Sequence, residues 1–168
     1  MDYSVEAETT QTCFATVQNK LHFAIHGRTA AELIVERADS KKGRMGLATW
    51  RNAPHGKILK PDVVVAKNYL TEKELKALDR IVTMYLDYAE DQAERGIPMT
   101  MQDWATKLNA FLQFNERELL LHPGKVSAEV AKAFAESEFE KYRIVQDRLF
   151  ESDFDRAIKK LPEKGGKP

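Results

Sequence analysis

A polar stripe follows the first predicted helix, where Gln18, His22 and His26 recur four residues apart. Residues at this spacing share one helix face, and a histidine pair at i and i+4 can bind zinc from that face. The zinc-protease pattern needs a glutamate directly after the first histidine, but this chain has Phe23 there. Because no cysteine or third histidine is close by in the sequence, we expect the pair to bond to neighbouring groups and to hold no metal or cofactor.

Two carboxylates follow Gly27, the glycine predicted to end this helix. Glu32 and Glu36 stand one helical turn apart, so they can form a carboxylate pair for general acid–base catalysis or add a third metal ligand to the histidines. In the alternative, Glu32 caps a helix that begins after Thr29, while Glu36 is solvated or pairs with a nearby arginine. The catalytic hypothesis is a hydrolase or nuclease-like enzyme with the candidate residues Gln18, His22, His26, Glu32, Glu36 and Arg37.

The segment 41–67 is rich in lysine and arginine and contains a single acid, Asp62. Basic groups beside an aromatic ring can hold phosphates and stack a base, which makes a weak, salt-sensitive nucleic-acid contact one hypothesis. The candidates for it are Lys41, Lys42, Arg44, Trp50, Arg51, Lys57 and Lys60. In the alternative, this segment is a solvated loop whose charge offsets acidic helices, and Trp50 is buried.

Composition excludes several classes of protein. The 168 residues suit one domain, and 26 basic against 26 acidic side chains argue against a strong nonspecific polyanion binder. The chain contains no glycine-rich nucleotide loop and no nucleophile motif, and its single cysteine, Cys13, cannot form an internal disulfide. It also has no apolar run of membrane-spanning length and no signal peptide at its start. We therefore expect a cytoplasmic protein that makes no membrane contact.

The elements that must position these residues are helices, so the predicted fold class is all-α, with one domain of about five helices. The central one covers 71–95, because Thr71 and Glu74 form a capping box and apolar residues then recur at steps of three and four. Leu78 and Val82 lie in the middle of its predicted apolar face. Capping patterns also predict helices after Thr29 and after Thr100, the latter running to about residue 121. We expect 1–12 and 162–168 to be flexible and 13–161 to form the domain.

The segment 40–70 interrupts this pattern, because its glycines and prolines exclude a long helix. A structureless stretch of this length is unusual inside a compact domain, so we expect it to be packed. Leu47 and Trp50 are the predicted anchors. Ile58 is predicted to lie in a short strand or extended pairing, and Pro61 to begin a short helix.

The last predicted helix covers 127–161 and is longer than the helices it packs on. Its predicted apolar side is Val130, Phe134, Tyr142, Val145 and Leu149, with Phe139 near the edge. Its far end still carries Phe150, Phe154 and Ile158. An overhang of that kind exposes apolar surface, which favours a homodimer through this helix, with two-fold symmetry, over a break near Ser152.

Several blocks, in order along the chain, carry a resemblance: 14–22 (FATVQNKLH), 29–34 (TAAELI), 36–39 (ERAD), 46–50 (GLATW), 66–70 (AKNYL), 81–90 (IVTMYLDYAE) and 114–118 (FNERE). Over about residues 2–161 the chain resembles the C-terminal domain of the RhuM-type virulence protein family. The resemblance implies a bacterial, virulence-associated protein. It also implies a DNA-binding region before this domain in full-length members, so we expect this chain to be an excised or free-standing C-terminal module. No catalytic residues carry over, so we predict a non-enzymatic interaction or regulatory module, with the enzyme above as the alternative.

Overall fold

The computed structural model describes residues 8–159, and within this range the protein is all-α, as predicted. Five α-helices follow one another: α1 (Glu8–His26), α2 (Ala30–Arg37), α3 (Glu72–Glu94), α4 (Met101–Phe114) and α5 (Ala128–Lys159). Three short 3-10 turns lie between α2 and α3: η1 (Gly43–Gly46), η2 (Lys60–Val64) and η3 (Ala66–Tyr69). None of the described helices is long and apolar enough to cross a bilayer.

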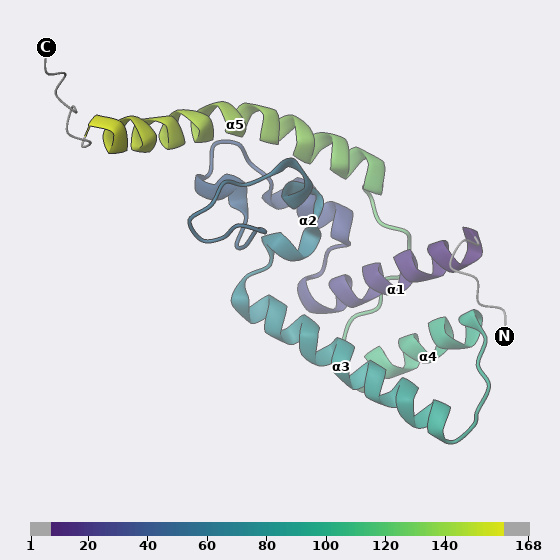
Figure 1. Ribbon diagram of the computed structural model, residues 1–168. Coiled ribbons are helices and arrows are strands. Elements are labelled where there is room, and N and C mark those ends of the chain that lie inside the picture. Colours follow the sequence, from purple (N-terminus) through teal and green to yellow (C-terminus); the bar gives the residue numbers. More distant parts are fainter. Residues whose placement is uncertain (1–7, 160–168) are drawn as a thin grey trace, which may run out of the picture.

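The helices pack in two groups that meet at α2 (Figure 1). In the first group, α1 contacts both α3 and α4, and in the second, α5 lies across α2 and the turns η1 and η2. Leu108 and Leu112 on α4 are fully buried in the first group, while Leu33 on α2 and Met45 on η1 are fully buried in the second. The polar residues of interest lie between the groups, at the short connection from α1 to α2.

Local capping explains where three helices begin. The hydroxyls of Thr29, Thr71 and Thr100 each accept a hydrogen bond from the third residue of their helix. The carboxylates of that third residue, Glu32, Glu74 and Asp103, accept one from the cap backbone in return. Each pair satisfies two N–H groups that the first turn otherwise leaves unpaired. All three predicted capping boxes are confirmed.

The first helix begins at Glu8, earlier than the start predicted after Thr12. Leu21 and Ile25, near its C-terminal end, pack in or against the core. Phe14, near its N-terminal end, is half exposed.

The fourth helix ends at Phe114, well before the predicted end near residue 121. Glu116 adopts a left-handed conformation, with φ at 57°. Its N–H donates to the Gln113 carbonyl at 3.0 Å, and the Arg117 N–H donates to the Leu112 carbonyl at 2.9 Å. These two bonds form a Schellman motif, which satisfies the last carbonyls of the helix. The sequence hides this end because the left-handed position is usually a glycine.

Replacing Glu116 with glycine is expected to raise the free energy of unfolding by about 0.5–1 kcal/mol, because a left-handed conformation is strained for a residue with a Cβ. Urea denaturation of the Glu116→Gly variant measures the gain. Glu116→Ala is the matched control, since alanine keeps the Cβ and should bring no gain. Equal stability of the two variants would contradict the role assigned to this conformation.

The irregular segment is packed, as predicted, and both predicted anchors are buried, Leu47 at 5% exposure and Trp50 at 7%. The predicted short helix is η2, with Pro61 in its first turn. Ile58 does not lie in a strand. Its backbone N–H donates to Gln146 Oε1 at 2.8 Å, and its carbonyl accepts from Gln146 Nε2 at 3.0 Å. A side chain of α5 therefore supplies the pairing that a neighbouring strand would have provided.

The buried face of α5 differs from the predicted one. Its fully or nearly fully buried residues are Ala131, Ala135, Phe139 and Gln146. By contrast, Val130, Val145 and Leu149 expose more than half of their side chains. Alanine lets the α5 backbone approach α2 closely, so the helix packs on its small residues. The prediction was therefore wrong for Val130, Val145 and Leu149, whereas Phe134 and Tyr142 of the predicted face do pack against the core.

The C-terminal end of α5 extends beyond the rest of the protein (Figure 1). The helix continues without a break through Ser152, and its 32 residues span about 48 Å at about 1.5 Å per residue. Near this end, Lys57 of the packed segment forms an ion pair with Asp147 and a cation–π contact with Phe150. Farther along, Ile158 is half-exposed. The side chain of Phe154 lies outside the described residues.

Candidate functional site

The histidine pair lies at the C-terminal end of α1. Nδ1 of His22 and Nε2 of His26 are 3.0 Å apart, so one ring donates a hydrogen bond to the other. His22 is buried, with 1% of its surface exposed. The remaining ring nitrogen of His26, Nδ1, is also buried and has no hydrogen-bond partner within residues 8–159. The two histidines bond to each other, as the non-metal alternative predicted, but His22 is buried and not partly exposed.

Both histidines are held in the neutral form. Burial lowers the pKa of His22 to about 4, and the neighbouring charges of His26 and Lys67 act in the same direction. Burial also lowers the pKa of His26, where the effects of Glu74 and Glu36 oppose those of Arg37 and Arg28. A neutral imidazole pair, with His22 buried and His26 partly buried, is a hydrogen-bonded part of the structure at pH 7.

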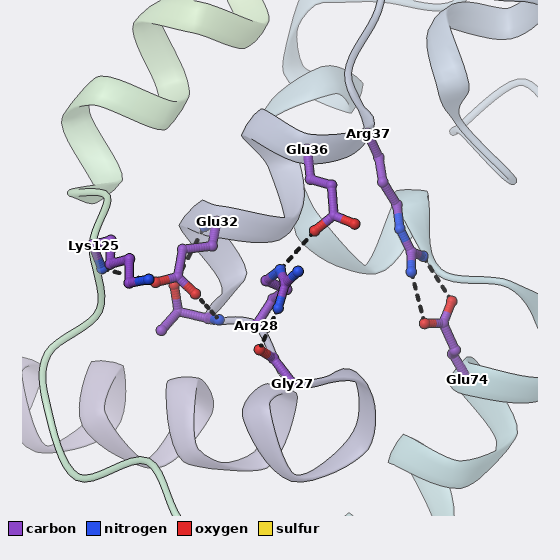
Figure 2. Close-up of polar contacts among 8 residues, drawn as sticks. Gly27, Arg28, Glu32, Glu36, Arg37, Glu74 and Lys125 are labelled. Atoms are coloured by element: carbon purple, nitrogen blue, oxygen red, sulfur yellow. Dashed lines mark hydrogen bonds and ion pairs between the residues drawn. The ribbon is translucent and has the colours of Figure 1, made fainter.

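Arg37 is bound to α3 by a two-pronged ion pair. Its two terminal nitrogens donate to the two carboxylate oxygens of Glu74 at 2.7 and 2.8 Å (Figure 2). Its Nη1 also donates to the Tyr69 carbonyl at 2.9 Å. The hydrogen bonds from Arg37 hold the pKa of Glu74 at about 2, well below its usual range. Since both side chains are mostly buried, this pair links the two helix groups.

Glu32 and Glu36 point to different partners (Figure 2). Glu32 accepts hydrogen bonds from the backbone N–H of Thr29 at 3.0 Å and of Lys125 at 2.7 Å. Burial raises the pKa of Glu32, but the backbone N–H groups of Lys125 and Thr29 lower it more, and the net shift is downward. Glu36 forms an exposed ion pair with Arg28 at 2.8 Å. The carboxylates therefore act as a helix cap and an ion-pair partner, as the alternative reading expected.

Gln18 stands apart from this cluster. It is exposed on α1 and lines a cavity of about 320 Å³ whose other walls come from α2, the η2–η3 link and the start of α5. Across the described part of the chain, no three His, Cys, Asp or Glu side chains gather in a way that could hold a metal ion. The structure thus gathers His22, His26, Glu36 and Arg37 around the connection from α1 to α2 and leaves Gln18 outside.

The basic segment is divided between paired and exposed side chains. Lys57 meets Asp147 at 2.9 Å, and Lys60 meets Glu136 at 3.9 Å, both on α5. These pairs use the basic charge to hold the segment against α5. Trp50 is buried, and its indole N–H donates to the Gly56 carbonyl at 2.8 Å. Lys60 is nevertheless exposed, and so are four other candidates: Lys41, Lys42, Arg44 and Arg51.

Arg44 covers the Trp50 ring: its guanidinium lies 5.5 Å from the ring centre. A buried ring that is already covered by an arginine leaves little surface for stacking a nucleobase. The geometry favours the reading of Trp50 as a packing anchor.

Two features with possible functional roles were missed by sequence reasoning. Glu74 was assigned only a capping role, although the same carboxylate also binds Arg37. Exposed apolar residues on the solvent side of α5, such as Ile144, were not distinguished from its buried face. The bond between Glu74 and Arg37 joins residues 37 positions apart, and no local sequence pattern indicates such a contact.

Comparison with known proteins gives one match. The family model for the virulence protein RhuM family matches residues 1–151, which is nearly the whole chain. Searches of curated proteins and of solved structures gave no match. The matched range includes the α1–α2 connection, the packed segment and most of α5. The chain therefore belongs to the virulence protein RhuM family.

Proposed function

We propose that this protein is a non-enzymatic interaction module that acts in the cytoplasm and self-associates through α5. Several of the candidate catalytic residues are bonded to other groups of the protein, which supports a non-enzymatic role. Their polar groups face one another or the backbone: His22 bonds to His26, Glu32 to Thr29 and Lys125, and Glu36 to Arg28. A general base needs a reachable proton on a substrate, and these groups are already used in bonds within the protein.

The observation that carries the proposal is the length of α5 beyond the domain. Gln146, Asp147 and Phe150 of α5 contact the packed segment, and the helix runs on past them to Lys159. Ile158, in this extension, exposes 49% of its surface, and Phe150 exposes 37%. Phe150 and Ile158 are eight residues apart in a continuous helix, so they lie on the same side of it. An apolar stripe on a projecting helix is typical of an interface.

Self-association can be measured by size-exclusion chromatography with light scattering at tens of micromolar protein. We expect a dimer for the natural sequence and a shift toward monomer for Phe154→Ser combined with Ile158→Ser, because both changes remove apolar area from the contact. Leu121→Ser is the matched control, since Leu121 is 86% exposed in the link between α4 and α5 and lies outside the extension. A monomeric natural sequence, unchanged by the double substitution, would overturn the proposal.

A further inference from the structure

A cleft of about 840 Å³ lies at the turn between α3 and α4. Its lining is mostly apolar: Ala93, Gly96, Ile97, Pro98, Met99, Thr100 and Trp104. Trp104 is held in place by edge-on contacts with Tyr85 and Tyr88, with ring centres 6.0 and 6.3 Å away. In addition, Tyr85 donates its hydroxyl hydrogen to the Trp104 carbonyl at 2.6 Å. The floor of the cleft is therefore a fixed aromatic surface, while Ile97 at its edge is 39% exposed.

The chain around this cleft is strongly acidic. Residues 87–103 contain five acids, Asp87, Glu90, Asp91, Glu94 and Asp103, and a single base, Arg95. Arg95 is already paired with Asp91 at 3.4 Å. Glu90 and Glu94 are exposed one turn apart on α3, close to Ala93 and Gly96 of the lining. An apolar cleft with such a rim suits a segment that combines apolar and positively charged side chains.

The C-terminal segment 158–168, here called the tail, has this composition. It contains four lysines and one glutamate together with Ile158 and Leu161, which are three residues apart. The described part of the tail ends at Lys159, where both Ile158 and Lys159 are exposed. In Figure 1 the end of α5 points away from the α3–α4 turn, and the two lie at opposite ends of the molecule. The cleft of the same chain is thus badly placed to receive the tail.

We propose that the tail of each copy binds the α3–α4 cleft of a second copy, reciprocally, in a two-fold dimer. This proposal rests on the proposed function, because it names the surface that receives the projecting end of α5. When two copies lie antiparallel, opposite ends of the molecule come together twice, which is the condition for a closed two-fold contact. Ile158 and Leu161 would face the cleft floor, and the lysines would face Glu90 and Glu94.

The tail is long enough for this contact. Nine residues, 160–168, follow the last described residue, and they reach up to about 30 Å at about 3.4 Å per extended residue. The opposed charges hold the tail in place, and the apolar side chains provide the burial. Since most of the charges are at the surface, the dimer is expected to weaken as salt is raised.

Charge reversal tests the pairing in the full chain. The tail variant carries Lys159→Glu and Lys160→Glu, and the cleft variant carries Glu90→Lys and Glu94→Lys. Each is expected to raise the dimer dissociation constant by about tenfold or more, since several attractive charge pairs become repulsive at once. Light scattering and analytical ultracentrifugation give the constants. The control variant carries Lys41→Glu and Lys42→Glu, just before η1. It makes the same change of net charge as the tail variant and is expected to leave the dimer intact.

Mixing then identifies the partner of each surface. An equimolar mixture of the tail and cleft variants is expected to form dimers again, because each copy meets a partner of opposite charge at both contacts. A cleft variant that dimerises as well as the natural sequence would overturn this inference while leaving self-association through α5 standing. A mixture that stays monomeric would also overturn it. A natural sequence that is monomeric at tens of micromolar would defeat both this inference and the proposed function.

Discussion

The free energy of unfolding is expected to fall by about 2 kcal/mol between pH 7 and pH 5, with His22 as the main cause. Burial, together with His26 and Lys67, lowers the pKa of His22 from its ordinary 6.5 to about 4. Between those two values the unfolded chain binds a proton that the folded chain does not. The stability contributed by neutral His22 is therefore complete above pH 6.5 and is lost as the pH falls toward 4. His26, whose pKa is also lowered, adds a loss of the same sign.

Urea denaturation at pH 7, 6 and 5 measures this slope. The His22→Phe variant keeps a buried ring but cannot titrate, so its stability should change much less over the same range. His55→Phe is the control, because His55 is exposed and its replacement should leave the slope in place. Glu74 does not contribute to this slope between pH 7 and pH 5. The stability that its ionised form contributes is present above its ordinary pKa of 4.5 and is lost only as the pH falls toward 2. A His22→Phe variant with the full pH dependence would contradict this assignment.

Replacing Leu78 with alanine is expected to lower the free energy of unfolding by about 2–5 kcal/mol, as other large-to-small core changes do. Leu78 is 4% exposed in the middle of α3 and belongs to the main core. Val82→Ala, one turn farther on, should cost less, because Val82 is only partly buried and loses fewer atoms. Chemical denaturation measures both losses.

Leu86→Ala is the matched control for these changes, since Leu86 lies on the same helix with 61% of its surface exposed. Its replacement should stay within about 0.5 kcal/mol, the usual range for surface positions. Losses at Leu78 and Val82 that are no larger than the loss at Leu86 would mean that α3 presents a different face to the core.

The sequence by itself determined where the capped helices begin, because capping involves groups only three residues apart. Thr29 with Glu32 and Thr71 with Glu74 can be recognised without any knowledge of the fold. The glycine end of α1 was predicted for the same reason, because Gly27 adopts the positive φ that a glycine tolerates without strain. The end of α4 was missed because Glu116 adopts this conformation without being a glycine.

Only the tertiary structure decided how these helices face one another. Side-chain size suggested Val145 and Leu149 as the buried side of α5, but close approach to α2 buried Ala131 and Ala135. Such a choice depends on the distance between backbones, which a single helix does not encode. The partners of the candidate site residues were decided in the same way. Glu74 caps its own helix and also binds Arg37, 37 residues away, because packing of α2 beside η3 and α3 brings the two charges together.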